Sequence, residues 1–455
     1  MSLPQTTGPA LRRMMGGREF FTLAFGSIVG VGWMMVVNDW LQRGGPGGAI
    51  LAYLAGGLLL VPVALVYGRL ALRMPESASE IAYTAAVFPP AVSFATGWTL
   101  TFAYLIVCPY EAVAIGEVVA YTFPEAMNAV ELYRIGKDPV CLPQLLLGIA
   151  TTMVITFLNF RGIQFSARFQ NYATFGLLAV FAVFATLGTW RGSVANLEPF
   201  FKHGEGFEAA LLSTLAVLPI VPYYLMGFET VPKCAEEASA DFDARNFGRI
   251  MLLALAVGTF FYVAVVAVVA LLHPWQELQD SRFATLIAFR EAFGWPWLVQ
   301  LIMAGAVLSL LKVFNGNFLT ATRLLYAMGR RAQLSGGLGT VNAARQTPTV
   351  AIILVGGVTL LASLLGRSVL VPISEVGSLA IALGWLATCL AYCRLAVRQS
   401  AGLGLGLVGA TVSAGLAVVV VVNSFDWPQW TVVGLWAALG LALYVTYRGG
   451  RLEAQ

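Results

Sequence analysis

The first hydrophobic stretch of the chain reads FFTLAFGSIVGVGW from Phe20 to Trp33, with glycine at positions 26, 30 and 32. Each glycine weakens a helix by about 1 kcal/mol relative to alanine. Non-helical backbone at membrane depth is tolerated only where it is buried in protein or lines a cavity. The stretch therefore predicts a broken, buried helix whose free backbone groups are available to a polar solute.

The composition is typical of a protein that crosses a bilayer many times. Of the 455 residues, 58% are hydrophobic and 11% are charged, against about 25% charged residues in soluble proteins. Apolar runs long enough to span a bilayer, about 20 residues, recur twelve times. They lie near residues 20–41, 48–72, 91–121, 143–163, 168–190, 208–232, 247–272, 297–327, 349–366, 370–394, 402–422 and 430–447.

The basic residues predict the orientation of these spans. Eighteen lysines and arginines flank one side and eight flank the other, and cytoplasmic loops carry the excess of positive charge. We therefore expect a multi-pass protein of the inner or plasma membrane with both termini in the cytoplasm. We expect a tail at residues 1–19, a ten-helix core at 20–398, spans 11 and 12 at 399–448, and a tail at 449–455.

The sixth span is interrupted like the first. It reads LPIVPYYLMGFE from Leu218 to Glu229, with two prolines and a glycine that disfavour a continuous helix. Interrupted helices at matching positions of two five-span halves are typical of transporters built from inverted repeats, with the binding site at the repeat interface. The sequence thus predicts an all-α fold of twelve transmembrane helices with broken helices 1 and 6. A proline kink in span 6 and close helix packing through Gly26-x-x-x-Gly30 are the simpler alternatives.

The ionisable residues within spans are functional candidates, because charge is costly in lipid. Glu111 follows Pro109 in the third span, and we interpret it as facing water or a substrate, or as forming a buried ion pair with Lys312. Glu117 lies near the external end of the same span and is expected to be solvated. Glu229 follows the break of the sixth span, where it either caps N–H groups of the next half-helix or contacts substrate.

Lys312 lies in the middle of the eighth span and has three interpretations. A buried lysine loses affinity for its proton, so this residue could carry protons. It could also be a fixed positive charge at a position where a sodium-driven transporter holds an ion. In the third interpretation it forms a salt bridge to a carboxylate and has no role in transport.

No cluster of residues predicts a metal, a cofactor or a nucleic acid. His203 and His273 fall in predicted external loops, and no metal-ligand spacing is present. The run from Gly404 to Gly409 matches G-x-G-x-x-G, but no strand precedes it, as a dinucleotide site requires. The net charge of +4 follows from the bias of the loops rather than from a nucleic-acid-binding patch. We see no catalytic cluster that would indicate an enzyme.

Several motifs together resemble the amino acid–polyamine–organocation superfamily of secondary transporters. The motifs are Gly26 to Gly32, Gly227 to Val231 with Glu236-Glu237 and Asn246 to Ile250, Asn315-Gly316, Thr322 to Arg330, Thr347-Pro348, Pro75-Glu76-Ser77 and Gly97-Trp98. The resemblance extends from about Arg18 to Arg398. It implies a five-plus-five inverted repeat, with spans 11 and 12 outside it and substrate held between broken helices 1 and 6.

The resemblance also implies roles for individual residues. The substrate carboxylate would bind the motif Ser27-Ile28-Val29-Gly30-Val31, and the α-amino group would meet carbonyls from Tyr223 to Met226 and near Phe25 and Gly26. Tyr223 corresponds to an aromatic gate. From the resemblance and from the residues themselves together, the expected binding residues are Gly26, Ser27, Ile28, Val29, Gly30, Val31, Trp33, Glu111, Tyr223, Tyr224, Met226 and Gly227. On the same two grounds, the expected gating and coupling residues are Tyr223, Glu229, Lys312 and Asn315.

The chain departs from its relatives at Trp33, at Ala78-Ser79, at Glu111 and at Lys312. Glu111 and Glu229 favour a cationic or amine-bearing substrate, and Trp33 and Tyr223 could supply a cation–π face for it.

We therefore expect a secondary transporter of an amino acid or a related organic amine. We expect it to work by alternating access, without sodium, and by proton symport or exchange. One alternative is a neutral amino-acid exchanger in which Glu111 and Lys312 pair only structurally. A membrane nutrient sensor is the alternative outside the transporter class.

Overall fold

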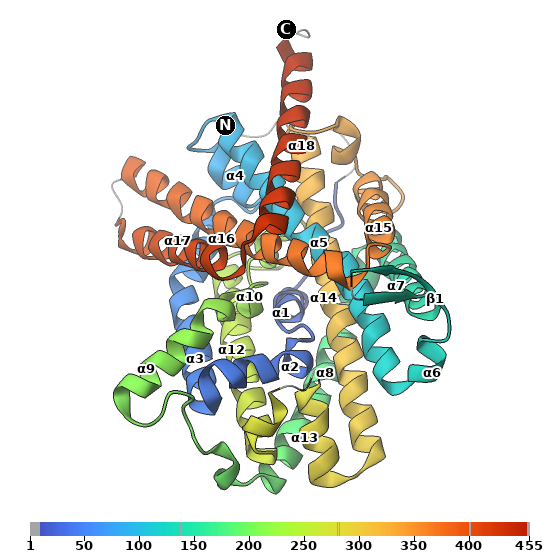
Figure 1. The fold of residues 1–455 in the computed structure, drawn as a ribbon. Helices are drawn as coiled ribbons and strands as arrows, with labels where there is room; N and C mark the ends of the chain where they lie inside the picture. The colour runs from blue at the N-terminus through green and yellow to red at the C-terminus, as the bar shows by residue number, and fades with distance from the viewer. Residues whose placement is uncertain (1–9, 137, 280, 282, 400–401, 453–455) are drawn as a thin grey trace.

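The computed structural model describes residues 10–136, 138–279, 281, 283–399 and 402–452, which form a bundle of helices (Figure 1). Ten helical segments in these ranges are long and apolar enough to cross a membrane, which confirms a helical multi-pass membrane protein. The first predicted span is not among the ten because it is broken, and the ninth because its helix has 15 residues. The count of twelve stays a prediction, and the predicted tails at 1–19 and 449–455 lie partly outside the described residues.

Ten helices form most of the bundle. They are α3 (Val37–Arg73), α5 (Pro90–Thr122), α7 (Leu142–Arg161), α8 (Ile163–Arg191), α12 (Asn246–Leu272), α14 (Pro296–Arg330), α15 (Thr349–Ser363), α16 (Gly366–Arg398), α17 (Gly404–Ser424) and α18 (Trp427–Leu452). Eight shorter helices connect or interrupt them. They are α1 (Gly17–Ile28), α2 (Gly32–Met35), α4 (Glu80–Ala85), α6 (Pro124–Met127), α9 (Gly206–Val217), α10 (Val221–Leu225), α11 (Thr230–Lys233) and α13 (Ala284–Phe293). The 3-10 turns are η1 (Val194–Leu197), η2 (Leu218–Ile220), η3 (Ala235–Glu237), η4 (Trp275–Leu278) and η5 (Gly336–Gly339).

The first span breaks within its glycine-rich segment, as predicted. Helix α1 ends at Ile28, and Val29 has extended backbone with φ −91° and ψ 93°. The four-residue helix α2 follows at Gly32. Three residues, from Val29 to Val31, thus lie between the two helices.

The sixth span breaks at the predicted glycine. Helix α9 passes through the turn η2 into α10, which ends at Leu225. Met226 is extended, and Gly227 has a φ of 131°, a conformation that side chains with a Cβ rarely adopt. Helix α11 then begins at Thr230. Proline at positions 219 and 222 removes backbone donors on the N-terminal side of this break.

A turn at GGPGG, residues 44–48, lies near the N-terminal end of α3. Gly45 has a φ of 68°, and the backbone changes direction there. A Cβ at Gly45 would lie 2.9 Å from the amide nitrogen of Lys202, so backbone packing also requires a glycine.

A β-hairpin that the sequence did not indicate lies between α6 and α7. Strand β1 (Glu131–Ile135) pairs antiparallel with β2 (Asp138–Cys141). The hydroxyl of Tyr133 donates to the carbonyl of Leu364, and the hydroxyl of Ser368 donates to Asp138, which fastens the hairpin to the start of α16. The strands are short and β1 is mostly exposed, so they lack the apolar alternation that predicts a strand.

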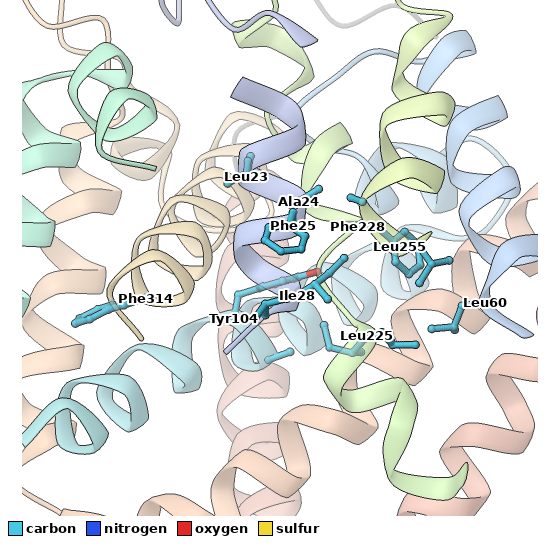
Figure 2. Packing of buried hydrophobic residues seen from close by; sticks show 14 of the residues in the cluster. Leu23, Ala24, Phe25, Ile28, Leu60, Tyr104, Leu225, Phe228, Leu255 and Phe314 are labelled. Carbon is cyan, nitrogen blue, oxygen red and sulfur yellow. The ribbon is translucent and has the colours of Figure 1, made fainter. Parts of the chain in front are cut away.

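Helix α1 lies at the centre of the bundle (Figure 1). Its residues from Thr22 to Ile28 are all buried, and it packs against α8, α12 and α14. Figure 2 shows Phe314 of α14 on one side of α1 and Phe228 and Leu255 on the other. A broken helix is therefore shielded from lipid, as the backbone rule for membranes requires.

Buried ion pairs join the loops on the predicted cytoplasmic side. Arg323 of α14 makes a two-pronged contact with Glu237, with nitrogen–oxygen distances of 2.6 and 2.9 Å. Lys233 of α11 lies 2.5 Å from Glu80 of α4, and neither side chain is exposed. These pairs tie the segment after the sixth-span break to α4 and α14.

We expect Arg323→Gln to destabilise the fold strongly. Removing one partner of a buried ion pair leaves an uncompensated charge and costs about 3–5 kcal/mol. The midpoint of thermal unfolding of the purified protein in detergent measures this loss.

Arg245→Gln is the matched control, because its pair with Asp243 is solvent-exposed (77% and 46% of the side chains) and such pairs contribute about 0–1 kcal/mol. Equal shifts of the two midpoints would contradict a structural role for the buried pair.

Candidate functional site

A cavity of about 110 Å³ lies between the two helix breaks. The sixth span contributes Tyr223, Tyr224 and Met226, and the first break contributes Ser27, Ile28, Gly30, Val31, Gly32, Met35 and Val36. The remaining lining side chains come from four further helices: Val107, Tyr110 and Glu111 of α5, Tyr262 of α12, Val313 and Asn317 of α14, and Arg367 of α16. The cavity thus brings together the two interrupted spans that the sequence singled out.

The two breaks touch through their backbones. A Cβ at Gly227 would lie 2.7 Å from the amide nitrogen of Ile28 and 2.8 Å from the carbonyl carbon of Ser27. Such distances are well inside van der Waals contact, so only glycine allows this approach. The geometry of one break is therefore fixed by the other.

Side-chain donors satisfy the free carbonyls of the first break. The ammonium of Lys312 donates to the carbonyls of Gly26, at 3.0 Å, and of Val29. The hydroxyl of Ser309 donates to Val29 and Gly30 at 2.9 and 2.8 Å. The hydroxyl of Tyr262 donates to the carbonyl of Ile28 at 3.1 Å.

The backbone groups left over at the two breaks differ in polarity. Within the described residues, the amides of Val31 and Gly32 donate no hydrogen bond, so the first break offers N–H donors. The carbonyls of Tyr223, Tyr224 and Leu225, at the end of α10, accept none in the same part of the chain. Donors on one wall and acceptors on the other suit a solute that carries both a negative and a positive group.

Glu111 and Lys312 hold separate positions around the cavity. Glu111 lines it, is 5% exposed, and has one carboxylate oxygen (Oε2) that no donor in the described ranges reaches. Lys312 is fully buried and is bonded to the broken backbone of span 1. No direct ion pair joins the two side chains among the described residues, so the predicted alternative of a Glu111–Lys312 salt bridge is not what the structure contains.

Glu229 binds the backbone within the sixth-span break and does not line the cavity. Its carboxylate accepts from the amide of Gly227 and from the hydroxyl of Tyr104, each at 2.9 Å. The carboxylate therefore bonds an amide within the break and no N–H of α11 in the described chain, which differs from the predicted capping of the next half-helix. Glu117, expected to be solvated, instead lies 2.6 Å from Arg367 and joins α5 to α16.

Some predicted site residues lie elsewhere. The ring of Trp33 packs against Phe184 and Phe261 and does not line the cavity, so it offers no cation–π face there. Asn315 accepts from Asn159 and Ser166, linking α14 to α7 and α8 behind α1.

Gly26 and Val29 of the predicted binding set present their carbonyls to Lys312. The Gly26 carbonyl, expected to meet a substrate amine, is therefore already bonded to an ammonium.

Sequence reasoning missed several residues at the site. Ser309 lies three residues before Lys312, a spacing that puts both on one face of a helix and could have indicated its role. Arg367 lies between the predicted spans 349–366 and 370–394, and Tyr110 and Tyr262 carry no distinguishing pattern. Their positions depend on how α5, α12 and α16 pack around the breaks.

A second cavity of about 250 Å³ lies on the predicted external side of the first. Tyr110, Tyr223 and Tyr224 line both cavities, so these three side chains form the partition between them. Asp39, Arg43 and Glu375 lie around the outer cavity, which gives it a polar rim. We call these cavities the inner and outer cavity.

We expect Gly227→Ala to destabilise the contact between the breaks. The new Cβ meets backbone atoms that have no room to move, and the positive φ costs an L-residue about 1–3 kcal/mol in addition. Gly357→Ala is the control, because an added Cβ there meets nothing within 4 Å. A lower midpoint of thermal unfolding for Gly227→Ala alone is the expected result. Equal midpoints for the two variants would show that the breaks do not depend on close backbone contact.

Comparison with known proteins identifies the family. The sequence profile described as amino acid permease matches residues 16–445. Amino-acid permease RocE of Bacillus subtilis (strain 168) is 24% identical over 85% of this chain and 81% of its own length. Branched-chain amino acid permease BcaP of the same organism is 25% identical over 96% and 93%. Lysine-specific permease LysP of Escherichia coli (strain K12) is 22% identical over 71% and 65%.

The resemblance read from the motifs is thereby confirmed, and it covers nearly the whole chain. The chain belongs to the amino acid permease family and is a multi-pass membrane transporter of amino acids.

Proposed function

We propose that this permease carries an amino acid with a cationic side chain, or a related organic amine, without using sodium and by alternating access. The observation that carries this proposal is the inner cavity between the two breaks, which combines backbone donors, backbone acceptors and the free carboxylate oxygen of Glu111. The names of the similar permeases range from branched-chain amino acids to lysine, so the cavity itself must indicate the substrate.

The backbone polarity supports recognition of the α-amino-acid group. A carboxylate at the amides of Val31 and Gly32 would satisfy donors that have no partner in the described chain. An ammonium at the carbonyls of Tyr223 to Leu225 would satisfy the opposite set. Discontinuous helices in transporters recognise charged groups through such half-helix ends.

The carboxylate of Glu111 supports the proposal that the substrate carries a second positive charge. A buried carboxylate oxygen without a donor is costly, and a cationic group entering the cavity would remove that cost. Lys312 does not fill this role, because its ammonium is bonded to Gly26 and Val29. Glu229 does not compete for substrate either, because Tyr104 and Gly227 use its two oxygens.

Lys312 supports independence from sodium. Carbonyls at an unwound segment are ligands that a transporter can offer to a sodium ion. Here the ammonium of Lys312 already donates to two such carbonyls, so the positive charge is built into the chain. The driving force is then a proton gradient or the exchange of one substrate for another.

The two cavities support alternating access in the cell membrane, with both termini in the cytoplasm. In this orientation the outer cavity lies toward the exterior and shares Tyr110, Tyr223 and Tyr224 with the inner cavity. On the cytoplasmic side, the pairs of Arg323 with Glu237 and of Lys233 with Glu80 hold the bundle closed. Transport then requires these contacts to open in turn.

We expect Glu111→Gln to weaken the binding of cationic substrates selectively. Hydrogen bonds to a charged group contribute about 1.5–3 kcal/mol, so the dissociation constants of lysine and arginine should rise roughly 10- to 100-fold. Binding is measured by the thermal shift of the purified protein with added amino acids, since a ligand of the folded state raises its apparent stability.

The exposed Glu125→Gln is the control, and neutral amino acids should bind both variants as they bind the unmodified protein. Unchanged binding of the cationic amino acids to Glu111→Gln would instead favour a neutral amino-acid exchanger.

We expect uptake into liposomes to be the same in sodium and in potassium media. Lys312→Met should abolish uptake in both, because the carbonyls of Gly26 and Val29 lose their donor. The exposed Lys202→Met serves as the control. An imposed pH gradient and preloaded unlabelled substrate distinguish proton symport from exchange. An absolute requirement of the unmodified protein for a sodium gradient would overturn the proposal.

A further inference from the structure

A larger, apolar cavity lies apart from the transport site, between α5, α16 and α18. Its volume is about 380 Å³, within the range of about 300–1,000 Å³ that small-molecule sites occupy. Phe94 and Phe102 of α5, Leu379 of α16, and Val433 and Leu441 of α18 are among its walls. Among the described residues, none that lines the inner or the outer cavity also lines this one. We call it the lateral cavity.

The walls of the lateral cavity have no free indole donor. Trp98 and Trp436 stack with ring centroids 4.2 Å apart. The Nε1–H of Trp98 donates to the carbonyl of Trp436 at 2.9 Å, and the Nε1–H of Trp436 donates to the carbonyl of Trp98 at 3.1 Å. Both indole N–H groups of the wall are thus bonded to the protein and not offered to a ligand, which favours an apolar one.

Helix α18 covers the cavity from outside while remaining exposed itself. It passes over α16 and α5 (Figure 1), and Leu435 and Leu441 are 68% and 65% exposed. In a bilayer this helix faces hydrocarbon. Lipid acyl chains are the molecules that surround the cavity at this depth.

Two exposed arginines lie at the predicted cytoplasmic end of the lateral cavity. The guanidinium of Arg394 lies 5.5 Å from the centre of the Phe88 ring, and Arg398 donates to the carbonyl of Ala86 at 3.0 Å. The segment Ala86–Phe88 leads directly into α5, whose first residues Ala91 and Phe94 line the cavity. Basic residues at this surface attract anionic lipids, and arginine binds phosphate with two parallel hydrogen bonds.

We propose that the lateral cavity binds an acyl chain of an anionic phospholipid from the cytoplasmic leaflet, whose phosphate contacts Arg394 and Arg398. The apolar walls fit the acyl chain of the lipid. The two positive charges fit its headgroup, because they lie at the cytoplasmic end of the cavity, where the headgroup would be. This site is independent of the transport cavity and of the substrate proposed for it.

Photo-crosslinking in liposomes tests the site. The probes are phosphatidylglycerol and phosphatidylcholine, each with a diazirine in one acyl chain, and labelled peptides of the full-length protein are identified by mass spectrometry. We expect phosphatidylglycerol to label the segments 91–102 and 433–444 in preference to phosphatidylcholine. Replacing both arginines by glutamine should weaken the binding of phosphatidylglycerol, measured by competition, about 30-fold. Each basic residue near the surface that is lost weakens the binding of an anionic lipid by a similar factor. Arg161→Gln, an exposed arginine on another face, should leave it unchanged.

Filling the cavity tests the position of the acyl chain. Ala437→Phe and Ala95→Phe place a ring among the lining residues and should abolish labelling of both segments. Ala438→Phe adds the same ring at an exposed neighbouring position that does not line the cavity, and should retain the labelling. Retained labelling in both filled variants would overturn the site. Equal labelling by the two lipids would overturn the role of the arginines, and crosslinks between two protein chains through these segments would assign the cavity to a second copy instead.

Discussion

The donation of two hydrogen bonds from Lys312 to the broken backbone of span 1 is the interaction on which the rest of the structure depends. In a membrane, carbonyls released by a helix break have no water to bond, so a break persists only where the protein supplies donors. Lys312, Ser309 and Tyr262 supply them from α14 and α12. Because these carbonyls are already bonded, the backbone groups that remain free at the first break are N–H donors. The first break therefore gives the inner cavity a wall of hydrogen-bond donors.

The sequence was sufficient to predict the main architecture, because its signals are local. Glycine at 26, 30 and 32 and proline at 219 and 222 act on their own stretch of backbone, and both breaks lie there. The apolar runs fix most long helices, such as α12 and α14, to within a few residues. The turn at Gly45 follows from a motif that few residues other than glycine can form.

Contacts between distant helices could not be predicted in the same way. Lys312 was recognised as important, yet its partner is backbone rather than Glu111, because the choice depends on how deeply α14 packs against α1. Trp33 was expected in the cavity, and the direction of its side chain depends on a four-residue helix after an irregular segment. Arg367 reaches the inner cavity from the start of α16, which sequence alone places in a loop.

Under the proposed transport cycle, the three tyrosines shared by the inner and outer cavities make the two barriers unequal. A barrier one side chain thick yields to rotation about side-chain bonds, which takes far less time than the movement of whole helices. The opposite barrier consists of buried ion pairs that link α4, α11 and α14, and it yields only when those elements separate. Such a molecule would exchange solute rapidly with the compartment on the tyrosine side and slowly with the compartment on the side of the ion pairs. Opening of the ion-paired barrier would then limit the rate of the transport cycle.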